Sequence, residues 1–499
     1  MSVSDAPAEA TTTGGGRRWL ALVVLAVSLG LIVLDGTIVG VALPVIIADL
    51  GMSLTGAEWV NSLYSVVFAA LLMTAGRLGD RFGRRTLLII GMAVFVGGSL
   101  LAALAGGASA LIAARAVQGL GGAMILPSTL STVNATFRGK DRAIAFGVWG
   151  AVMAGSAALG PLFGGLLTTY ATWHWIFLIN VPLGVALIVA ALLIVPETTG
   201  EQTAGRDIPG PVLAAIGFGA FVFGLIEGAN LGWWQPQNVL AIGSWEWGLD
   251  APISPAPVAL AVGVIFIAAF IGYEHRRGDR ARVLDTSLFA IPTFAWGNLT
   301  AGLVAVGEFS LVFVLPLYLV IVLGLDTLGA GFVLVAMAGG AFLAGASARH
   351  LSASLGPARV VVLGLLLEVI GTAATAVLVG AQYGPGWVAA TMAVYGVGVG
   401  LASAQVTSVV LADVPVSESG TGSAVQSTVR QIGAALGAAL GGTVLSTVLG
   451  THLIQRVTPA DFAHASSIAV WSSFVVLVIG LLASLRLSAI ARCSPAAVD

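Results

Sequence analysis

Charge is scarce in this chain: Asp, Glu, Lys and Arg make up only 9% of its 499 residues, whereas 58% of the residues are hydrophobic. The mean hydropathy is +1.01. A water-soluble fold cannot bury so much apolar surface, so most of the chain must face lipid. The net charge is −2. Without an excess of positive charge, we expect no nucleic-acid partner.

Cysteine and lysine are almost absent. The single cysteine, Cys493, excludes a disulfide within the chain and a metal site built from several cysteines. The only lysine, Lys140, stands in "RGKDR", which does not match a phosphate-binding loop, and no G-x-S-x-G elbow occurs. The five histidines show no metal-ligand spacing. We therefore expect no enzyme, no cofactor and no metal site.

Long apolar runs fill most of the remaining sequence. A helix needs about 20 apolar residues to cross the hydrocarbon core of a bilayer. The first run continues beyond the length of a signal peptide, which predicts an uncleaved span. Fourteen runs qualify, near 18–46, 57–76, 86–106, 109–132, 143–168, 174–195, 209–231, 256–273, 291–322, 328–348, 359–380, 386–412, 421–450 and 468–488.

Positive charge is distributed unevenly between the two sides of these spans. If the N-terminus is cytoplasmic, every basic residue lies in a cytoplasmic segment except Arg115 and Arg430, within spans, and Arg456, outside. This bias predicts that both termini are cytoplasmic. All basic residues but one are arginine, a usage typical of a bacterial genome, so we expect a multi-pass protein of the bacterial cytoplasmic (inner) membrane.

The segment "GRLGDRFGRR", residues 76–85, concentrates charge between the second and third spans. Its arginines suit topology anchors, but this does not explain its acid or its glycines. The glycines permit tight turning, and the acid can pair with an arginine or cap a helix N-terminus. We expect the segment to latch helical units together on the cytoplasmic side. The residues of this latch are Gly76, Asp80, Arg81, Gly83, Arg84 and Arg85.

Segment 76–85 resembles the signature loop of the major facilitator superfamily. "RAVQGLGGA", residues 115–123, resembles the fourth-span motif of that family, and "GPLFGG", residues 160–165, resembles the fifth-span motif associated with antiporters. Three further segments resemble the fourteen-span drug:proton antiporter branch: "LDGTIVGVALP" (34–44), "WHWIFLINVPLG" (173–184) and "STVRQIGAALG" (427–437). The chain departs from these patterns at Gly40, where that branch usually has asparagine, and at Ser156, where a glycine often stands.

The resemblance implies an all-α integral membrane protein of two six-helix bundles plus two inserted helices. Spans 1, 4, 9 and 12 would line a central cavity, and spans 7 and 8 would form the inserted pair. The expected divisions are a disordered cytoplasmic tail (1–16), the N-terminal bundle (17–195), the linker and inserted pair (196–285), the C-terminal bundle (286–490) and a second cytoplasmic tail (491–499).

Two charged residues in the first bundle need an explanation, because an ionisable group at mid-bilayer costs at least ~2.5–3.5 kcal/mol. Burial favours the neutral form of a carboxyl, so Asp35 in span 1 suits a proton carrier; the alternative is a structural ion pair with an arginine. In similar transporters the arginine at the position of Arg115 is linked to proton coupling, and a structural role is equally open. Helical spacing puts Gln118 on the same stripe as Arg115.

The other intramembrane charges carry less specific signals. Glu308 in span 9 suits a cationic substrate or a second proton, or else a pairing that holds the bundles together. Glu227 in span 7 is better explained by a structural hydrogen bond, and Glu368 has no functional explanation. Arg430 suits a pairing with Glu418 or a position reaching the cytoplasmic surface. The candidates for the substrate cavity are Asp35, Gln118, Glu227 and Glu308, and those for proton coupling are Asp35, Arg115 and Glu308.

Small residues in span 5 form another pattern. Glycines four residues apart let helices approach closely in a membrane, and a proline lets a helix bend. We expect these properties of Gly160, Pro161, Gly164 and Gly165.

The resemblance implies proton-coupled efflux of hydrophobic or amphipathic compounds, cationic ones among them, by a monomer using alternating access. Its partners would be a small-molecule substrate, protons and the lipid bilayer. The alternatives are a dedicated exporter of one antibiotic or metabolite, and a proton symporter. A channel would need a continuous polar lining, whereas the intramembrane charges here are isolated.

Overall fold

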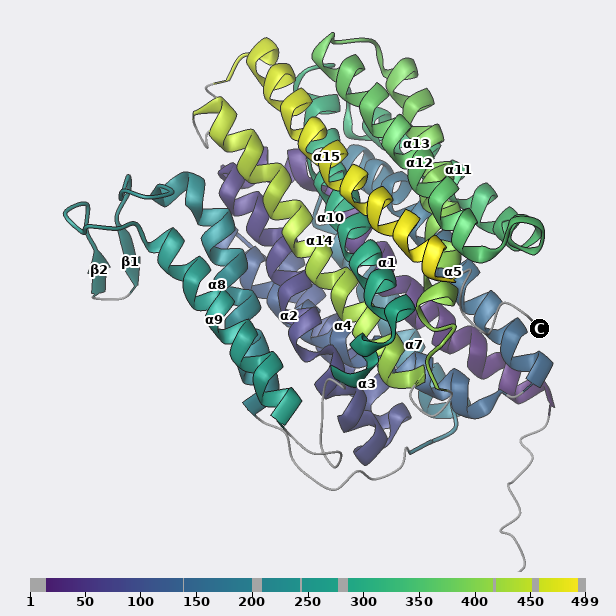
Figure 1. Cartoon of the computed structure of the whole chain (residues 1–499). Helices are drawn as coiled ribbons and strands as arrows, with labels where there is room; N and C mark the ends of the chain where they lie inside the picture. The colour runs from purple at the N-terminus through teal and green to yellow at the C-terminus, as the bar shows by residue number, and fades with distance from the viewer. Residues whose placement is uncertain are drawn as a thin grey trace, which may run out of the picture.

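The computed structural model describes residues 15–137, 139–199, 209–242, 245–276, 286–415, 419–450 and 457–491. These residues form long helices, with a short hairpin of β1 (Leu240–Ile242) and β2 (Trp245–Trp247) and one 3-10 turn, η1 (Thr286–Ala290) (Figure 1). The helices are α1 (Gly15–Leu50), α2 (Leu54–Phe82), α3 (Arg84–Ala103), α4 (Ala108–Thr136), α5 (Gly139–Tyr170), α6 (Trp175–Leu178), α7 (Asn180–Ile194), α8 (Pro209–Leu231), α9 (Pro255–Arg276), α10 (Pro292–Ile321), α11 (Thr327–Leu355), α12 (Pro357–Gly380), α13 (Pro385–Val410), α14 (Ser419–Leu449) and α15 (Pro459–Ala491).

The apolar runs of the sequence coincide with these helices. Within the described ranges, twelve helical segments are long and apolar enough to cross a membrane, or up to thirteen if the two pieces of α2, bent by 50°, form one span. The predicted fifth span coincides with α5, which is outside that set. An all-α, multi-pass protein is therefore confirmed, whereas the count of fourteen spans stays a prediction.

The helix ends follow from local chemistry. Ser53 caps α2 by accepting a hydrogen bond from the Gly56 amide at 3.1 Å, and Asp326 caps α11 by accepting one from the Gly329 amide at 2.8 Å. Gly83 separates α2 from α3 with φ +106°, and Gly356 separates α11 from α12 with φ +82°. Only glycine adopts such φ values readily, so the two halves of the chain turn by the same device.

The helices form two groups. α1 to α7 pack on one another, α10 to α15 pack on one another, and the groups meet where α1, α2 and α5 contact α10, α14 and α11 respectively. α8 and α9 pair along their length and lean on α2 and α14, at the edge of the molecule where Figure 1 shows them with the hairpin beyond. The observed arrangement is two bundles with an inserted helix pair.

The hydrophobic core is shared between the bundles mainly in the halves of the helices far from the chain termini, and a smaller shared cluster joins the middle of α2 to the middle of α14. In the halves of the helices far from the chain termini, residues 38–47 of α1 belong to the same buried cluster as residues 311–319 of α10. In the halves near the termini, the main clusters stay within single bundles: one joins α1 with α3 and α4, and another joins α10 with α12, α13 and α15. The bundles are therefore closed against each other at the end away from the termini.

Close helix packing depends on particular glycines, and Gly121 provides a test. A Cβ added at Gly121 of α4 would lie 2.6 Å from the backbone nitrogen of Phe95 and 2.7 Å from the carbonyl oxygen of Gly91, both on α3. Gly121→Val should therefore destabilise the protein by about 1–3 kcal/mol, because overpacking forces the two helices apart. The measurement is the apparent melting temperature of the purified protein in detergent.

The matched control is Gly97→Val on α3, because a Cβ at Gly97 meets no atom within 4 Å. Its melting temperature should stay near that of the parent. Equal melting temperatures for the two valine variants would contradict the packing argument.

Candidate functional site

A buried polar cluster surrounds Asp35 of α1. The Asp35 side chain is 0% exposed and that of Arg115, on α4, is 1% exposed. Arg115 Nη1 donates to Asp35 Oδ2 at 2.5 Å. Gln118 Nε2 and Asn180 Nδ2 donate to Asp35 Oδ1 at 3.0 and 2.7 Å. Both carboxylate oxygens of Asp35 are therefore occupied by donors, one of them a cation.

The second ring of contacts holds these donors in place. Arg115 also donates to Gln118 Oε1 at 2.8 Å and to the Val60 carbonyl at 3.2 Å. Ser99 Oγ of α3 accepts from the side chains of Gln118 at 2.8 Å and Asn180 at 3.2 Å. The Arg115 guanidinium lies 4.2 Å from the centre of the Tyr64 ring. The cluster thus connects α1, α2, α3, α4 and α7.

This geometry answers a question that the sequence left open, because Asp35 and Arg115 do contact each other. Arg115 and Gln118 share a helix face, as their spacing predicts. A buried ion pair is tolerated where its remaining hydrogen-bonding capacity is filled, and the amides fill it here. A proton can neutralise Asp35 only at the expense of its pairing with Arg115. The roles of both residues in coupling stay predictions.

A second charged pair joins α10 to α14. Arg430 Nη2 lies 3.9 Å from Glu308 Oε2, and the two side chains are 33% and 19% exposed. Oε2 of Glu308 has no hydrogen-bond partner among the described residues. The pair is therefore looser and wetter than that of Asp35 and Arg115. Glu418, the partner considered for Arg430 from the sequence, lies outside the described residues.

A small hollow adjoins this pair. It lies between α10, α13 and α14, and its walls are apolar except for one hydroxyl and one guanidinium. Two of its three walls, α10 and α13, coincide with spans 9 and 12, which the family resemblance implied would line the central cavity. The lining residues are Ala301, Val304, Ala402, Ser403, Val406 and Arg430.

Glu227 of α8 does not join either cluster. Its Oε1 accepts from Trp59 Nε1 of α2 at 2.9 Å, and its Oε2 accepts from Asn230 Nδ2 at 3.0 Å. These are structural hydrogen bonds at the end away from the termini. They connect the inserted helix α8 to the first bundle rather than to the hollow beside Arg430.

Sequence reasoning missed three contributors. Asn180 follows directly after the apolar "WIFLI", so an amide side chain beside this apolar run was the available signal. Ser99 carries no signal in its sequence context. Glu58 of α2 falls at the edge of the predicted second span, where its sequence context carries no signal. In the structure it is 0% exposed, and neither carboxylate oxygen has a hydrogen-bond partner in the described ranges.

Segment 76–85 forms the end of α2 and the start of α3. Arg84 Nε and Nη2 donate to Asp80 Oδ1 at 2.9 and 2.8 Å, and Arg84 Nη1 donates to the Ser131 carbonyl of α4 at 3.1 Å. A Cβ at Gly76 would lie 3.6 Å from Pro127 of α4. Asp80 thus pairs with an arginine, as the sequence allowed, and the pair fastens the turn to α4.

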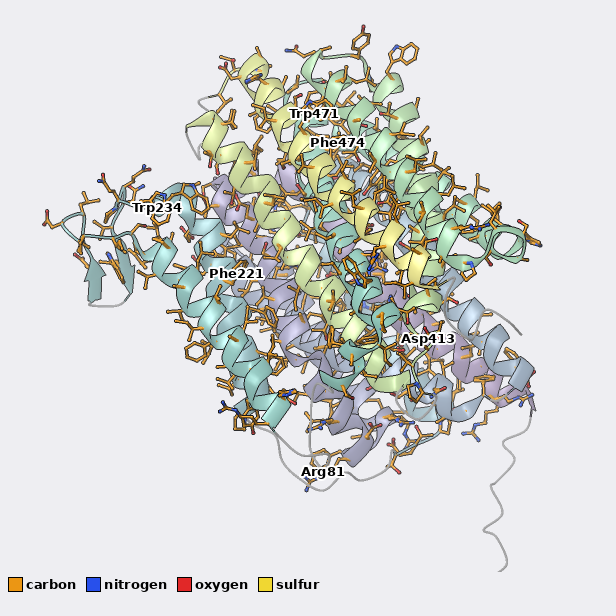
Figure 2. All side chains as sticks on the ribbon, in the orientation of Figure 1. Arg81, Phe221, Trp234, Asp413, Trp471 and Phe474 are labelled. Carbon is orange, nitrogen blue, oxygen red and sulfur yellow. The ribbon has the colours of Figure 1, made fainter. Side chains whose placement is uncertain are left out.

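The N-terminus of α3 is capped by Glu197, which the sequence did not indicate. Its carboxylate accepts from the backbone amides of Arg85 at 2.9 Å and Thr86 at 3.2 Å. A carboxylate here satisfies free amides and suits the positive end of the helix dipole. A Cβ at Gly83 would lie 2.6 Å from this carboxylate, so the turn needs glycine. Arg81 packs on Phe82 at the edge of the molecule (Figure 2).

The small residues of α5 approach two other helices. A Cβ at Gly160 would meet the Thr37 side chain of α1, and one at Gly164 would lie 2.9 Å from the Ile38 carbonyl. On another side, a Cβ at Gly165 would lie 2.9 Å from the Leu328 Cα of α11. These glycines therefore bring α5 close to α1 within its bundle and to α11 across the bundle junction. Pro161 lies inside α5.

Two helical bundles with an inserted helix pair, and a charged pair buried inside one bundle, are an arrangement typical of membrane transporters. The model of the Major Facilitator Superfamily matches residues 25–438, so the chain belongs to that family. This is a family of transporters and not of enzymes, as the sequence predicted.

The chain is similar to several bacterial exporters. It is 32% identical over 435 residues, 87% of this chain and 82% of the relative, to the multidrug efflux pump LfrA of Mycolicibacterium smegmatis. It is also 32% identical to the probable actinorhodin transporter of Streptomyces coelicolor, over 86% of this chain and 73% of that one. Its fold resembles the crystal structure of a bacterial homologue of the human lysosomal transporter Spinster, with a TM-score of 0.64, 18% identity and coverage of 97% and 100%.

The pairing of Asp35 with Arg115 yields a prediction about stability. Arg115→Leu should cost about 3–5 kcal/mol, because it leaves a buried carboxylate without its cation. Asp35→Asn should cost a similar amount by leaving the arginine unpaired. The double variant Asp35→Asn, Arg115→Leu should recover part of the loss. Melting temperatures of the three variants in detergent measure the coupling energy.

The outcome also separates the two interpretations of Asp35. Full stability of Asp35→Asn alone would show that the ion pair contributes nothing to folding. That result would remove the structural interpretation and leave proton carrying as the reason for the acid.

The pairing of Asp80 with Arg84 yields a prediction about transport. Asp80→Asn should leave membrane insertion intact and slow transport, because the turn loses its charge-assisted bond. The Asp80 side chain is 40% exposed, so solvent weakens the pair and we expect a fall of roughly 2–5-fold. The measurement is the initial rate of substrate efflux at matched membrane levels.

The control is Arg81→Gln, which removes a charge from the same turn without touching that pair. An Asp80→Asn protein with the parent's initial rate would contradict a latching role for this turn.

Proposed function

We propose that the protein exports hydrophobic or amphipathic compounds, cationic ones among them, across the bacterial cytoplasmic membrane in exchange for protons. The observation that carries the proposal is the core that the two bundles share in the halves of their helices away from the termini, combined with a partly exposed acid, Glu308, on α10. The relatives add support, because their names describe multidrug and antibiotic exporters.

The distribution of basic residues supports cytoplasmic termini. With that orientation, the shared core of α1 and α10 lies in the outer half of the membrane. The bundles are then sealed toward the outside, and their inner halves are held by separate cores. This is the inward-facing state of an alternating-access cycle, in which a substrate enters from the cytoplasm or the inner leaflet.

Glu308 suits a cationic group of a substrate, because it is a partly exposed acid whose Oε2 has no hydrogen-bond partner among the described residues. Arg430 competes with a cationic substrate for Glu308. It holds the acid weakly, because its Nη2 lies 3.9 Å from Glu308 Oε2 and its side chain is partly exposed. A cationic substrate displaces Arg430 from Glu308 at a small cost.

Proton coupling is assigned first to Asp35 and then to Glu308. Protonation of Asp35 removes the charge that Arg115 binds, so it loosens the contacts between α1 and α4. The energy is adequate, because one charge moving through about 100 mV yields ~2.3 kcal/mol, or roughly a 50-fold concentration ratio. The proton therefore supplies both the energy and a change in helix contacts.

A narrower function is the second candidate: export of one antibiotic. Similar proteins include the probable actinorhodin transporter and, at 35% identity over 64% of this chain, the puromycin resistance protein pur8 of Streptomyces alboniger. The multidrug efflux pump LfrA, which is similar over more of this chain than pur8, supports the broader function.

The test is a susceptibility panel of cationic and neutral compounds in an efflux-deficient bacterium that expresses the chain. The parent should raise resistance to several unrelated compounds, and a protonophore should abolish their efflux. Glu308→Gln should lower the resistance to cationic compounds at least about tenfold, because a tenfold loss of affinity corresponds to roughly 1.4 kcal/mol of binding free energy. Its resistance to neutral compounds should equal that of the parent.

The control is Glu246→Gln in the exposed hairpin, which should behave as the parent. Resistance to one compound alone would favour the narrower function. Efflux that survives the protonophore would remove proton coupling, and equal losses for cations and neutral compounds would remove the role of Glu308 in charge selection.

A further inference from the structure

The carboxyl group of Glu58 lies at the junction of the two bundles without a hydrogen-bond donor. Its side chain is 0% exposed, and neither oxygen has a partner among the described residues. A Cβ added at Gly442 of α14 would collide with the Glu58 carboxyl group. The acid therefore extends from α2 of one bundle onto the backbone of α14 of the other.

The polar group beside Glu58 on α14 is the Thr443 hydroxyl. That hydroxyl has a single hydrogen, and it donates this hydrogen to the Leu225 carbonyl of α8 at 3.0 Å. Only its lone pairs remain for Glu58. Thr443 therefore directs its hydrogen to α8 and leaves the Glu58 carboxyl without a donor among the described residues.

The charged neighbour of Glu58 is an acid. Glu227 of α8 is the titratable group that acts on Glu58 across this junction, where α14 presents Gly442 and Thr443. Glu227 accepts two hydrogen bonds from neutral donors, Trp59 and Asn230. Trp59, the residue after Glu58, thus holds a second carboxylate at the same junction, and nearby like charges disfavour the ionised form of the more buried acid. Glu227 has the donors that stabilise a charge, and Glu58 has none.

We propose that Glu58 is a proton-binding site at the outer junction of the bundles. It carries its proton while α2 and α14 are packed together. When they separate, the carboxyl releases the proton to outside water, and the two carboxylates repel each other. This deepens the proposed function and rests on it for the orientation and for alternating access.

The inserted pair takes a specific part in this device. α8 supplies Glu227, which α2 holds through Trp59, and it supplies the Leu225 carbonyl, which binds Thr443 of α14. Ser62 Oγ of α2 also donates to the Ala435 carbonyl of α14 at 3.1 Å. α8 thus fixes the second acid opposite Glu58. A proton bound from outside favours the closed outer end and is returned to the outside when that end opens, so Glu58 gates the outer junction and does not itself carry a proton across the membrane.

The test measures how far the outer ends lie apart as the pH changes. Spin labels are attached at Tyr170→Cys of α5 and Tyr383→Cys, both exposed, in a Cys493→Ser background. Pulsed electron paramagnetic resonance on the full chain in lipid nanodiscs then compares about pH 5.5 with about pH 8. The parent should shift from the short distance to a longer one at the higher pH. Glu58→Gln, which mimics the protonated acid, should keep the short distance at both values.

The matched control is Glu368→Gln. Glu368 is also 0% exposed with both oxygens unpartnered in the described ranges, but it lies on α12 against Gly398 of α13, within one bundle. This variant should keep the parent's pH response. The proposal would be overturned if the distance between the labels in Glu58→Gln lengthened at the higher pH as it does in the parent. It would also be overturned if that distance in the parent did not change with pH.

A second variant covers the case in which Glu58→Gln folds poorly. Gly442→Ala should give the longer distance at both pH values, because its methyl group displaces the Glu58 carboxyl. Adding Glu58→Ala should restore the short distance, and failure of that rescue would overturn the contact. The distances between the labels are measured without a substrate, so they test the Glu58 site independently of the proposed function. If the protein gave no drug resistance but the distances still changed with pH, the proposed substrates would be rejected and the Glu58 site would be supported.

Discussion

The cost of placing a charge among helices in lipid governs the interior of this protein. Because each ionisable group must be paired, hydrated or neutral, the acids separate by their surroundings. Asp35 has a cation and two amides, and Glu308 has a loose cation and a partly exposed side chain. Glu58 and Glu368 have no donor among the described residues. The surroundings of Asp35 fill the acceptors of its carboxylate, whereas those of Glu58 and Glu368 offer a charge no partner.

These sites exist only because glycines let the helices approach each other. Along α14, Cβ atoms at Gly433 and Gly441 would lie 2.7 and 2.9 Å from carbonyl oxygens of α10, and one at Gly437 would meet the Val306 carbonyl. The same helix presents Gly442 to Glu58. One face of α14 thus packs within its bundle while a neighbouring position contacts the other bundle. A rigid helix of this kind transmits a change at the outer junction along its length to Arg430.

The sequence was sufficient for the helices and for the charges that stand in the middle of long apolar runs. Asp35 and Arg115 could be singled out because no other charged residue lies near them in sequence, but no spacing within one helix encodes their contact in the folded protein. Glu58 was missed because a span edge looks the same whether it meets water or another bundle. Glu197 was missed because capping of α3 from a distant segment leaves no local signature. The number of spans was not settled, since α5, which coincides with the predicted fifth span, is not among the candidate spans of the described residues.

The first helix of each bundle, α1 in one and α10 in the other, carries an acid, but the two acids have different surroundings. α1 and α10 each contain an internal proline, Pro44 and Pro316, and each carries its acid about two turns before it. Asp35 stands nine residues before its proline, but Glu308 stands only eight. One residue turns a side chain about 100° around a helix. Matched on their prolines, the two helices therefore direct their acids to different sides. This offset accounts for the difference between the two acids. Asp35 is enclosed by its own bundle, whereas Glu308 is partly exposed beside a hollow.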